Sequence, residues 1–351
     1  MRRAFVVSII VVLSGALLAL AGCGDEPVVV SREALGTVVT ITAYGEDEAA
    51  VTAAIDGAYA AMTAVEGQLD AYNNASAIAQ FNLTPYTPAA IPADANVILD
   101  EIGGLGVSAD FSPTLLGVLR LYDFEGAPKV PGDADLALAV AAANTFRRNG
   151  DGTVEFMRGD NPDTRLDAGG LLAPGLDFGG AAKGLALDRA REALKASGAV
   201  TAAIISSGSS TVTLGTKPDG GDWVIGIEDP RDPERIVATF TFEADGALST
   251  SGDYQRYFEQ DGRRYHHILH PSTGRPADGL RSLTVAGTSL TGLHTDILST
   301  ALFVMGPGEA QEWASDHGIA IYTVDTGGRA LSVPAPDDSG LKVDEKRDPE
   351  P

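Results

Sequence analysis

Residues 177–214 decide the fold class, and they read DFGGAAKGLALDRAREALKASGAVTAAIISSGSSTVTL. A glycine-rich turn leads into a helical pattern over Ala181–Ser197, which Gly198 ends at the position where helices favour glycine. The segment Ala202–Leu214, which contains several β-branched residues, then predicts a strand. A turn, a helix and a strand in direct succession indicate that helices and strands share one hydrophobic core.

The same two patterns recur on both sides of this stretch. Strands are predicted at Thr37–Tyr44, Trp223–Glu228, Val237–Phe242 and Arg281–Ala286, and helices at Glu46–Leu69 and Thr295–Met305. Residues 82–93 contain three prolines and are predicted to form a loop. Strands and helices interleave without a repeat or a clear linker. We therefore expect an α+β protein, with a single large mixed α/β domain over residues 33–333.

The two ends of the chain differ in composition from this domain. Residues 1–22 have a basic start and an apolar run from Ala4 to Leu20, which is typical of a bacterial secretory signal. Leu20-Ala21-Gly22-Cys23 resembles a lipobox, so we expect cleavage before Cys23, lipidation of Cys23 and a tether over residues 23–32. An uncleaved anchor, or an ordinary signal with an incidental cysteine, are the alternatives. Residues 334–351 are proline-rich and charged, which predicts a disordered tail.

Composition excludes several classes of function. The chain has 25 basic and 48 acidic residues, a net charge of −23, which repels the phosphate backbone of nucleic acids. With one cysteine, it can form no intramolecular disulfide, thiolate zinc cluster or iron–sulfur site. The predicted signal places the mature protein outside the cytoplasm, held to the cell membrane by its lipid.

The glycine-rich turn at Asp177–Gly184 could bind an anion. Glycines before a helix N-terminus let backbone N–H groups approach a phosphate, and Lys183 would add a positive charge one turn in. The spacing fits neither a Walker A loop nor a dinucleotide-binding fingerprint. A structural turn with a solvated Lys183 is the alternative.

Asp296 and Thr300 are four residues apart, so they lie on one face of the last predicted helix. A carboxylate and a hydroxyl are hard oxygen ligands that suit Mg²⁺, with substrate phosphates completing its coordination. Alternatively, Asp296 is a first-turn charge and Thr300 bonds its own backbone.

Residues 248–276 gather tyrosines, histidines and basic residues in an otherwise acidic protein. Tyr254–Phe258 and Tyr265–Ile268 are predicted to pair as a hairpin across the turn Asp261-Gly262. Arginine and histidine on such a hairpin would suit phosphate binding or acid–base chemistry, and exposed polar residues are the alternative. The crowded histidines lack carboxylate partners and do not predict a zinc site.

Five motifs, taken in order, resemble the ApbE family of FAD:protein FMN transferases over about residues 33–310. They are Leu35-Gly36-Thr37, Asp177-Phe178-Gly179-Gly180-Ala181-Ala182-Lys183-Gly184, Thr250-Ser251-Gly252-Asp253-Tyr254, Tyr265-His266-His267-Ile268-Leu269-His270-Pro271-Ser272-Thr273-Gly274 and Asp296-Ile297-Leu298-Ser299-Thr300-Ala301. The resemblance implies a domain of the T-fold-like ApbE type. It also implies Mg²⁺-dependent transfer of FMN from FAD to a threonine or serine hydroxyl of an acceptor protein, with release of AMP.

The resemblance also implies roles for individual residues. Metal ligands would be the side chains of Asp296 and Thr300 and the carbonyls of Gly180 and Ser299. His267 would polarise the pyrophosphate or assist proton transfer, and together with Asp296 it would form the catalytic pair. The flavin nucleotide would contact Leu35, Tyr72, Asp110, Phe111, Ser112, Asp177, Lys183 and the backbone of Ile268. Family acceptors are membrane-associated redox proteins, which implies such a partner here.

The chain departs from the family pattern at three positions. Ser112, Ser210 and His270 stand where the family usually has an aspartate. Two other functions therefore stay open beside FMN transfer. They are a Mg²⁺-dependent FAD pyrophosphatase, in which water replaces the acceptor hydroxyl, and a lipoprotein that binds flavin without catalysis.

Overall fold

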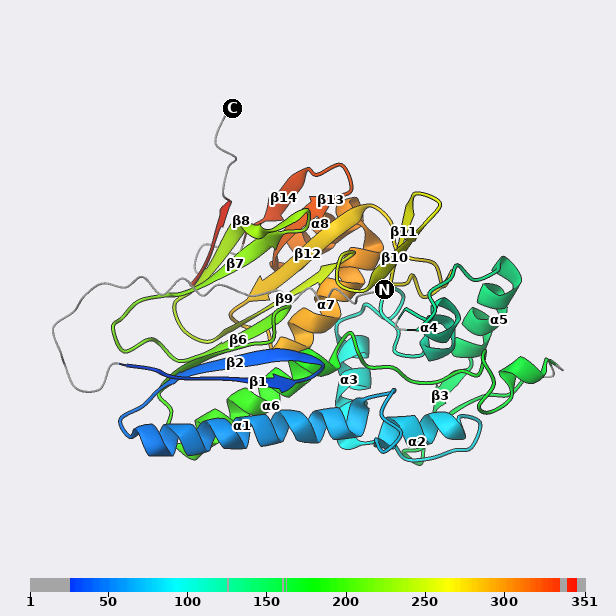
Figure 1. Ribbon diagram of the computed structural model, residues 1–351, viewed down its shortest axis with the longest axis horizontal. Helices are drawn as coiled ribbons and strands as arrows, with labels where there is room; N and C mark the ends of the chain where they lie inside the picture. The colour runs from blue at the N-terminus through cyan, green and yellow to red at the C-terminus, as the bar shows by residue number, and fades with distance from the viewer. Residues whose placement is uncertain (1–25, 125, 160, 162, 335–339, 346–351) are drawn as a thin grey trace.

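An antiparallel sheet of eight strands forms the centre of the molecule (Figure 1). The computed structural model describes residues 26–124, 126–159, 161, 163–334 and 340–345. In spatial order, the strands of the central sheet are β1 (Val28–Ala34), β2 (Thr37–Tyr44), β5 (Ala202–Ser206), β6 (Ser210–Leu214), β9 (Gly246–Gly252), β12 (Leu280–Gly287), β13 (Ala320–Asp325) and β14 (Ala330–Val333). The fold is therefore of the mixed, antiparallel α+β class predicted from the sequence.

The remaining elements cover this sheet. A second sheet consists of β15 (Leu341–Glu345), β8 (Asp232–Phe242) and β7 (Trp223–Asp229), and two hairpins are β3 (Phe146–Arg148) with β4 (Val154–Phe156) and β10 (Tyr257–Gln260) with β11 (Arg263–His266). The helices are α1 (Glu48–Leu69), α2 (Ala77–Leu83), α3 (Ala93–Gly104), α4 (Leu116–Tyr122), α5 (Asp133–Ala143), α6 (Ala182–Ser197), α7 (Gly292–Met305) and α8 (Pro307–His317). A 3₁₀ turn spans Thr164–Leu166.

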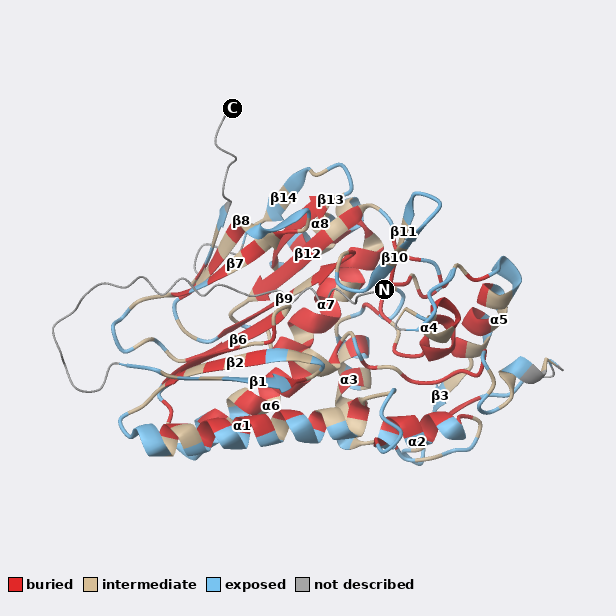
Figure 2. Ribbon diagram, viewed as in Figure 1, coloured by how far each residue is buried: buried red, intermediate tan, exposed pale blue. Residues whose placement is uncertain are grey.

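Both faces of the inner strands of the central sheet are buried, as Figure 2 shows by the red β6, β9 and β12, whereas the edge strands β1 and β14 are largely exposed. In β5, Ala203 and Ile205 pack into the core that contains α1, α6 and α7. Their neighbours Ala202 and Ile204 pack instead against β7 and β8. Because successive side chains of a strand point to opposite faces, a strand covered on both sides carries apolar residues throughout. For this reason β5 lacks the alternation of apolar and polar residues that a half-exposed strand has.

Helices α6 and α7 approach each other more closely than a side chain would allow. A Cβ atom on Gly184 would lie 2.1 Å from the carbonyl oxygen of Gly292 and 2.8 Å from the Cβ of Asp296. The buried carboxylate of Asp188 in α6 accepts hydrogen bonds of 2.8 Å from the backbone N–H groups of Gly292 and Leu293. It thereby satisfies two of the free N–H groups at the start of α7. The start of α7 is thus fixed on α6.

Most predicted elements are confirmed, including the strand Thr37–Tyr44 and the hairpin turn at Asp261-Gly262. The prediction of one strand over Ala202–Leu214 was wrong, because β5 and β6 are separate strands that pair with each other. The chain reverses at 207–209, where Gly208 has a φ of +85°. This backbone conformation favours glycine. Serines lie on both sides of Gly208, and the prediction of a single strand did not take this turn into account.

Two predictions at the ends of the domain also need correction. Val28–Ala34, expected to belong largely to the tether, is strand β1 and pairs with β2 along its whole length. In the tail expected to be disordered, Leu341–Glu345 is strand β15, which pairs with β8. Its Leu341 is buried in the core between the two sheets, which explains why a short polar segment is held there. Residues 1–25, with the predicted signal and Cys23, and 346–351 lie outside the described residues.

A search of the described residues finds no helix with the length and apolar character needed to span a membrane.

Replacing Gly184 with alanine tests the close approach of α6 and α7. We expect Gly184→Ala to lower the free energy of unfolding by about 1–3 kcal/mol, the usual cost of overpacking. In Gly57→Ala the new methyl group meets no atom within 4 Å. This matched change in α1 should stabilise the protein by about 0.5–1 kcal/mol, since alanine is the better helix former. Denaturant unfolding measures both values. Equal stability of the two variants would contradict the assigned packing.

Candidate functional site

A single large cavity brings together residues that are far apart in the sequence. Its volume is about 1480 Å³. Of the residues predicted for the site, the following line this cavity: Leu35, Tyr72, Asp110, Phe111, Ser112, Asp177, Gly180, Lys183, His267, Ile268, Asp296 and Thr300. Ser299 does not line the cavity and is buried beside it in α7. The cavity therefore unites the glycine-rich turn, the hairpin and the last predicted helix.

Helix α7 supplies a buried carboxylate to the cavity. The Oδ2 atom of Asp296 accepts a 2.8 Å hydrogen bond from the N–H of Gly184, and Oδ1 accepts a 3.2 Å bond from the hydroxyl of Ser210. Burial raises the pKa of Asp296, and the positive charge of Lys183 opposes this shift. Ser210 is one of the three positions where an aspartate was expected. Here it donates to Asp296, which a second carboxylate could not do while ionised.

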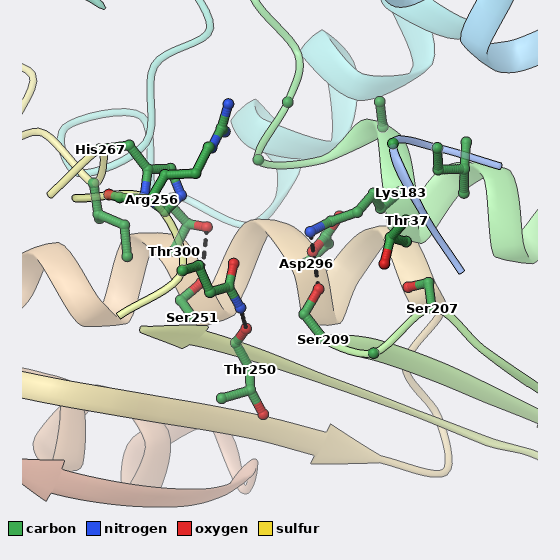
Figure 3. A pocket seen from close by; sticks show the side chains of 18 of the residues that line it. Thr37, Lys183, Ser207, Ser209, Thr250, Ser251, Arg256, His267, Asp296 and Thr300 are labelled. Atoms are coloured by element: carbon green, nitrogen blue, oxygen red, sulfur yellow. Dashed lines mark hydrogen bonds between the residues drawn. The ribbon is translucent and has the colours of Figure 1, made fainter. Parts of the chain in front are cut away.

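Lys183 lies next to Asp296, on the first turn of α6 (Figure 3). Its Nζ donates a 2.8 Å hydrogen bond to the hydroxyl of Ser209. Burial lowers the pKa of Lys183, and the nearby charge of Asp296 opposes this effect. The ammonium group of Lys183 is thus held by Ser209 at the cavity while the residue stays partly exposed, and its role in binding an anion stays a prediction.

The start of α6 faces the cavity. Its N-cap residue, Ala181, makes no side-chain capping bond, and Gly179, Gly180 and Ala182 line the cavity. Two N–H groups of the first turn already have partners, because that of Ala182 donates to the carbonyl of Phe178 and that of Gly184 donates to Asp296. A Cβ atom on Gly180 would lie 3.1 Å from the ring of Phe111, so a side chain here would crowd the turn. The positive end of the helix dipole and the ammonium of Lys183 favour a phosphate group at this point.

The donors around Asp296 and Thr300 fit a small, hard cation. Each oxygen of Asp296 accepts one hydrogen bond and keeps lone-pair capacity for another partner. The Oγ1 atom of Thr300 would lie 3.6 Å from a Cβ on Gly180, which places the glycine-rich turn beside α7. One carboxylate, one hydroxyl and nearby backbone carbonyls are an oxygen donor set of the kind that Mg²⁺ prefers.

An exposed tyrosine, Tyr72, lines the cavity beside the glycine-rich turn. The hydroxyl of Tyr72 donates a 2.8 Å hydrogen bond to Oδ2 of Asp177, whose Oδ1 accepts a 2.8 Å bond from the N–H of Gly179. Tyr72 is 55% exposed although its hydroxyl is held in place. Leu35 lines the same cavity from the turn between β1 and β2, with a φ of +55°. An anchored ring that is more than half exposed suits the stacking of an aromatic ligand.

Asp110, Phe111 and Ser112 line another wall of the cavity. Partial burial raises the pKa of Asp110. The hydroxyl of Ser112 pairs with that of Thr114 at 2.8 Å. Ser112 is another position where an aspartate was expected, so this wall carries a neutral hydroxyl pair in its place.

The histidines of the hairpin point in different directions. His266 is buried, with Nε2 3.0 Å from the carbonyl oxygen of Ala277, and burial lowers its pKa to about 4. His270 bonds Ser272 in the following turn. Only His267 of the three lines the cavity. Across the described part of the chain, no three His, Cys, Asp or Glu side chains form a group that could hold a metal ion.

His267 is held in one tautomer. Its Nδ1 lies 3.3 Å from the carbonyl oxygen of Arg256, which can only accept, so Nδ1 carries the proton and Nε2 keeps its lone pair. Its pKa is lowered well below the usual value by burial first, and then by the positive charges of Arg256, His266 and Lys183. A neutral imidazole cannot polarise a pyrophosphate by charge. Of the two predicted roles of His267, the structure favours proton acceptance.

Several residues at the cavity carry no predicted role. Ser209 lines the cavity and bonds Lys183, and it lies in the β5–β6 turn, inside the segment predicted as one strand. Ser210 is predicted only as the position of a missing aspartate, and it bonds Asp296 without lining the cavity. Arg256 was noted only as part of a basic hairpin, and Ser251 only as part of a motif, yet both line the cavity. Their spacing from the other site residues gave no signal, because the fold alone brings these segments together.

The comparisons with known proteins agree with this geometry. The FAD:protein FMN transferase of Klebsiella pneumoniae is 28% identical over 333 residues, covering 89% of this chain and 91% of that protein. The protein of the same name from Vibrio cholerae is 29% identical over 321 residues, covering 88% and 91%. The solved ApbE protein of Thermotoga maritima superposes with a TM-score of 0.75 at 27% identity, covering 87% of this chain and 96% of that one.

A second solved structure, the apo form of the flavinyl transferase ApbE of Pseudomonas stutzeri, has a TM-score of 0.70 at 29% identity and covers 88% of this chain and 95% of that one. The model of the ApbE family matches residues 35–323, which include every cavity residue predicted from the sequence. The chain therefore belongs to the ApbE family.

Proposed function

We propose that this protein is an FAD:protein FMN transferase, which moves FMN from FAD onto a threonine or serine hydroxyl of an acceptor protein and releases AMP. The observation that carries the proposal is the shared cavity. It places a hydrogen-bonded aromatic ring, a helix start with a partly buried lysine, a buried carboxylate and a histidine with a lowered pKa around one space. These groups suit, in turn, a flavin ring, a pyrophosphate, a cation and a reacting hydroxyl.

The size of the cavity supports a reaction with two substrates. Pockets for one small ligand usually measure ~300–1000 Å³, and this cavity measures about 1480 Å³. It is therefore large enough for FAD and for an entering segment of an acceptor. A protein that only binds flavin needs neither the additional space nor a buried carboxylate beside the phosphates. A pyrophosphatase would need the carboxylate but not the space.

The transfer is a substitution at the phosphorus atom of the FMN half of FAD. The acceptor oxygen forms a bond to this phosphorus, the bridging P–O bond breaks, and AMP leaves with the bridging oxygen. Nε2 of His267 is free to take the proton of the attacking hydroxyl. Lys183 and the start of α6 stabilise the negative charge that shifts onto the phosphate oxygens.

A Mg²⁺ ion held by Asp296, Thr300 and the carbonyls of Gly180 and Ser299 would neutralise charge on the pyrophosphate. The buried carboxylate favours such a cation, because an ionised carboxylate out of water needs a compensating positive charge. Lys183 supplies part of that charge when no metal is bound.

We also propose that the mature protein is an extracytoplasmic lipoprotein, anchored at Cys23, whose acceptors are membrane-associated redox proteins. The signal-like sequence before Cys23 supports the anchor. The net charge of −23 argues against nucleic acid as a partner.

Asp296→Ala tests the function and the metal site together. We expect AMP release and covalent flavin attachment to fall by at least ~10²-fold, the usual effect of losing one preorganised electrostatic group. FAD binding should largely survive, because it rests mainly on contacts to the flavin ring, in which Asp296 has no proposed part. The assay follows AMP and in-gel flavin fluorescence with a threonine-bearing acceptor, with EDTA as a control. Near-normal activity in the variant, or in EDTA, would contradict the proposal.

The pH dependence of the reaction tests the role of His267. A base with a lowered pKa stays neutral as the pH falls below 6.5, so the acidic midpoint of kcat/KM should lie below that value. Arg256→Gln removes a positive neighbour, which raises the pKa of His267 and should move the midpoint to higher pH. The backbone carbonyl that orients His267 stays in place. If the midpoint is unchanged or moves to lower pH, His267 is not the base that limits the rate.

Cys23→Ala tests the anchor. We expect the variant to leave the membrane fraction or to accumulate as an unprocessed precursor, since no acyl chain can be attached. Fractionation with mass spectrometry of the N-terminus measures this. A variant that stays acylated and membrane-bound would show that the lipid lies elsewhere.

A further inference from the structure

A continuous chain of hydrogen bonds joins three hydroxyl groups, those of Thr300, Ser251 and Ser299. The Oγ1 atom of Thr300 lies 3.1 Å from Oγ of Ser251 in β9, and that Oγ lies 3.0 Å from Oγ of Ser299. The hydroxyl of Ser299 then donates a 3.1 Å bond to the backbone carbonyl of Asp296. Figure 3 shows the first of these contacts on the floor of the cavity. The chain thus begins at the cavity and ends inside α7.

The carbonyl of Asp296, at the end of this hydrogen-bond chain, fixes the direction in which each hydroxyl group donates. A carbonyl only accepts, so the single proton of Ser299 is given to Asp296. The Oγ of Ser299 must then accept the proton of Ser251, and the Oγ of Ser251 must accept the proton of Thr300. The hydroxyl of Thr300 therefore donates into the protein, and only its oxygen lone pairs are left for the cavity.

We propose that Ser251 and the hydroxyl of Ser299 are positioning residues that hold Thr300 as a pure oxygen donor towards a divalent cation. The inference rests on the proposed function, since it concerns the cation expected at the same site. A free threonine hydroxyl can rotate and turn its proton towards the cation, which repels it. Because the hydroxyl of Thr300 donates its proton to Ser251, that proton cannot turn towards the cation.

A neighbouring pair of hydroxyl groups shows that such a hydrogen-bond chain is not a general feature of the contact between α7 and β9. One turn earlier in α7, Thr295 bonds Ser249 of β9 at 2.9 Å and donates to the carbonyl of Gly292 at 3.1 Å. Ser249 and Thr295 are both 0% exposed, and neither lines the cavity. There the threonine itself donates to the carbonyl, so nothing is presented to a ligand. Ser249 is therefore a matched control for Ser251.

The experiment measures Mn²⁺ binding to the purified protein by electron paramagnetic resonance, without FAD or acceptor. We expect Ser251→Ala to weaken binding by about fivefold, the usual effect of one hydrogen bond. Ser249→Ala should bind Mn²⁺ as the wild type does. In a Thr300→Val background, Ser251→Ala should cause no further loss, because Ser251 acts only through Thr300. Thermal unfolding of each variant verifies that it is folded.

Three results would overturn the inference. They are equal effects of Ser251→Ala and Ser249→Ala, additive losses for Ser251→Ala and Thr300→Val, and an absence of Mn²⁺ binding by the wild type. The proposed function fails separately, if the wild type binds Mn²⁺ but attaches no flavin to any acceptor.

Discussion

The site depends on the contact between α6 and α7, where two glycines allow the helices to touch at the backbone. Gly184 and Gly292 face each other, and a Cβ atom on either would lie within 2.6 Å of a carbonyl oxygen of the other. The N–H of Gly184 is consequently close enough to bond the carboxylate of Asp296. Without this approach, Lys183 and Asp296 would not share one end of the cavity.

Cationic side chains line the cavity although the chain as a whole is strongly acidic. The net charge is −23, and the cations are Lys183, Arg231, Arg256, Arg264 and Arg281. They share the cavity wall with eight carboxylates, those of Glu33, Glu66, Asp70, Asp110, Asp177, Glu228, Asp229 and Asp296. Screening limits the long-range repulsion between the acidic surface and a small anion, whereas nearby cations act at full strength once water is excluded. The protein can therefore disfavour polyanions such as nucleic acids and still bind the pyrophosphate of FAD.

The sequence predicted the elements that carry strong local signals. The α1, α6 and α7 helices and the β2 strand follow from periodicity, and Gly198 ends α6 as expected, with a φ of +66°. Local patterns could not predict β15, because that strand exists through its pairing with β8. The single strand predicted over Ala202–Leu214 passes over Ser206-Ser207-Gly208-Ser209-Ser210, whose serine and glycine content is itself a turn signal, so β5 and β6 could have been separated from the sequence.

The site residues were predicted in a similarly uneven way. Motifs and the resemblance to the ApbE family identified those facing the cavity, such as Tyr72, Lys183 and Thr300, although Tyr72 carries no local signal of its own. The roles of the serines that bond the site residues were not predicted, since Ser210 stood out only as a missing aspartate, Ser251 only as part of a motif, and Ser209 carried no assigned role. A serine beside a strand is common in any sequence, and only the three-dimensional arrangement shows which charged or polar group it bonds.

The most direct test of the account is a crystal structure of the complex with FAD and Mn²⁺, in which anomalous scattering locates the metal. The account predicts a Mn²⁺ peak bound to Asp296 and Thr300, with the pyrophosphate between this ion and the start of α6 and the flavin against Tyr72. A metal peak away from α7, or a pyrophosphate that does not reach Lys183, would contradict it.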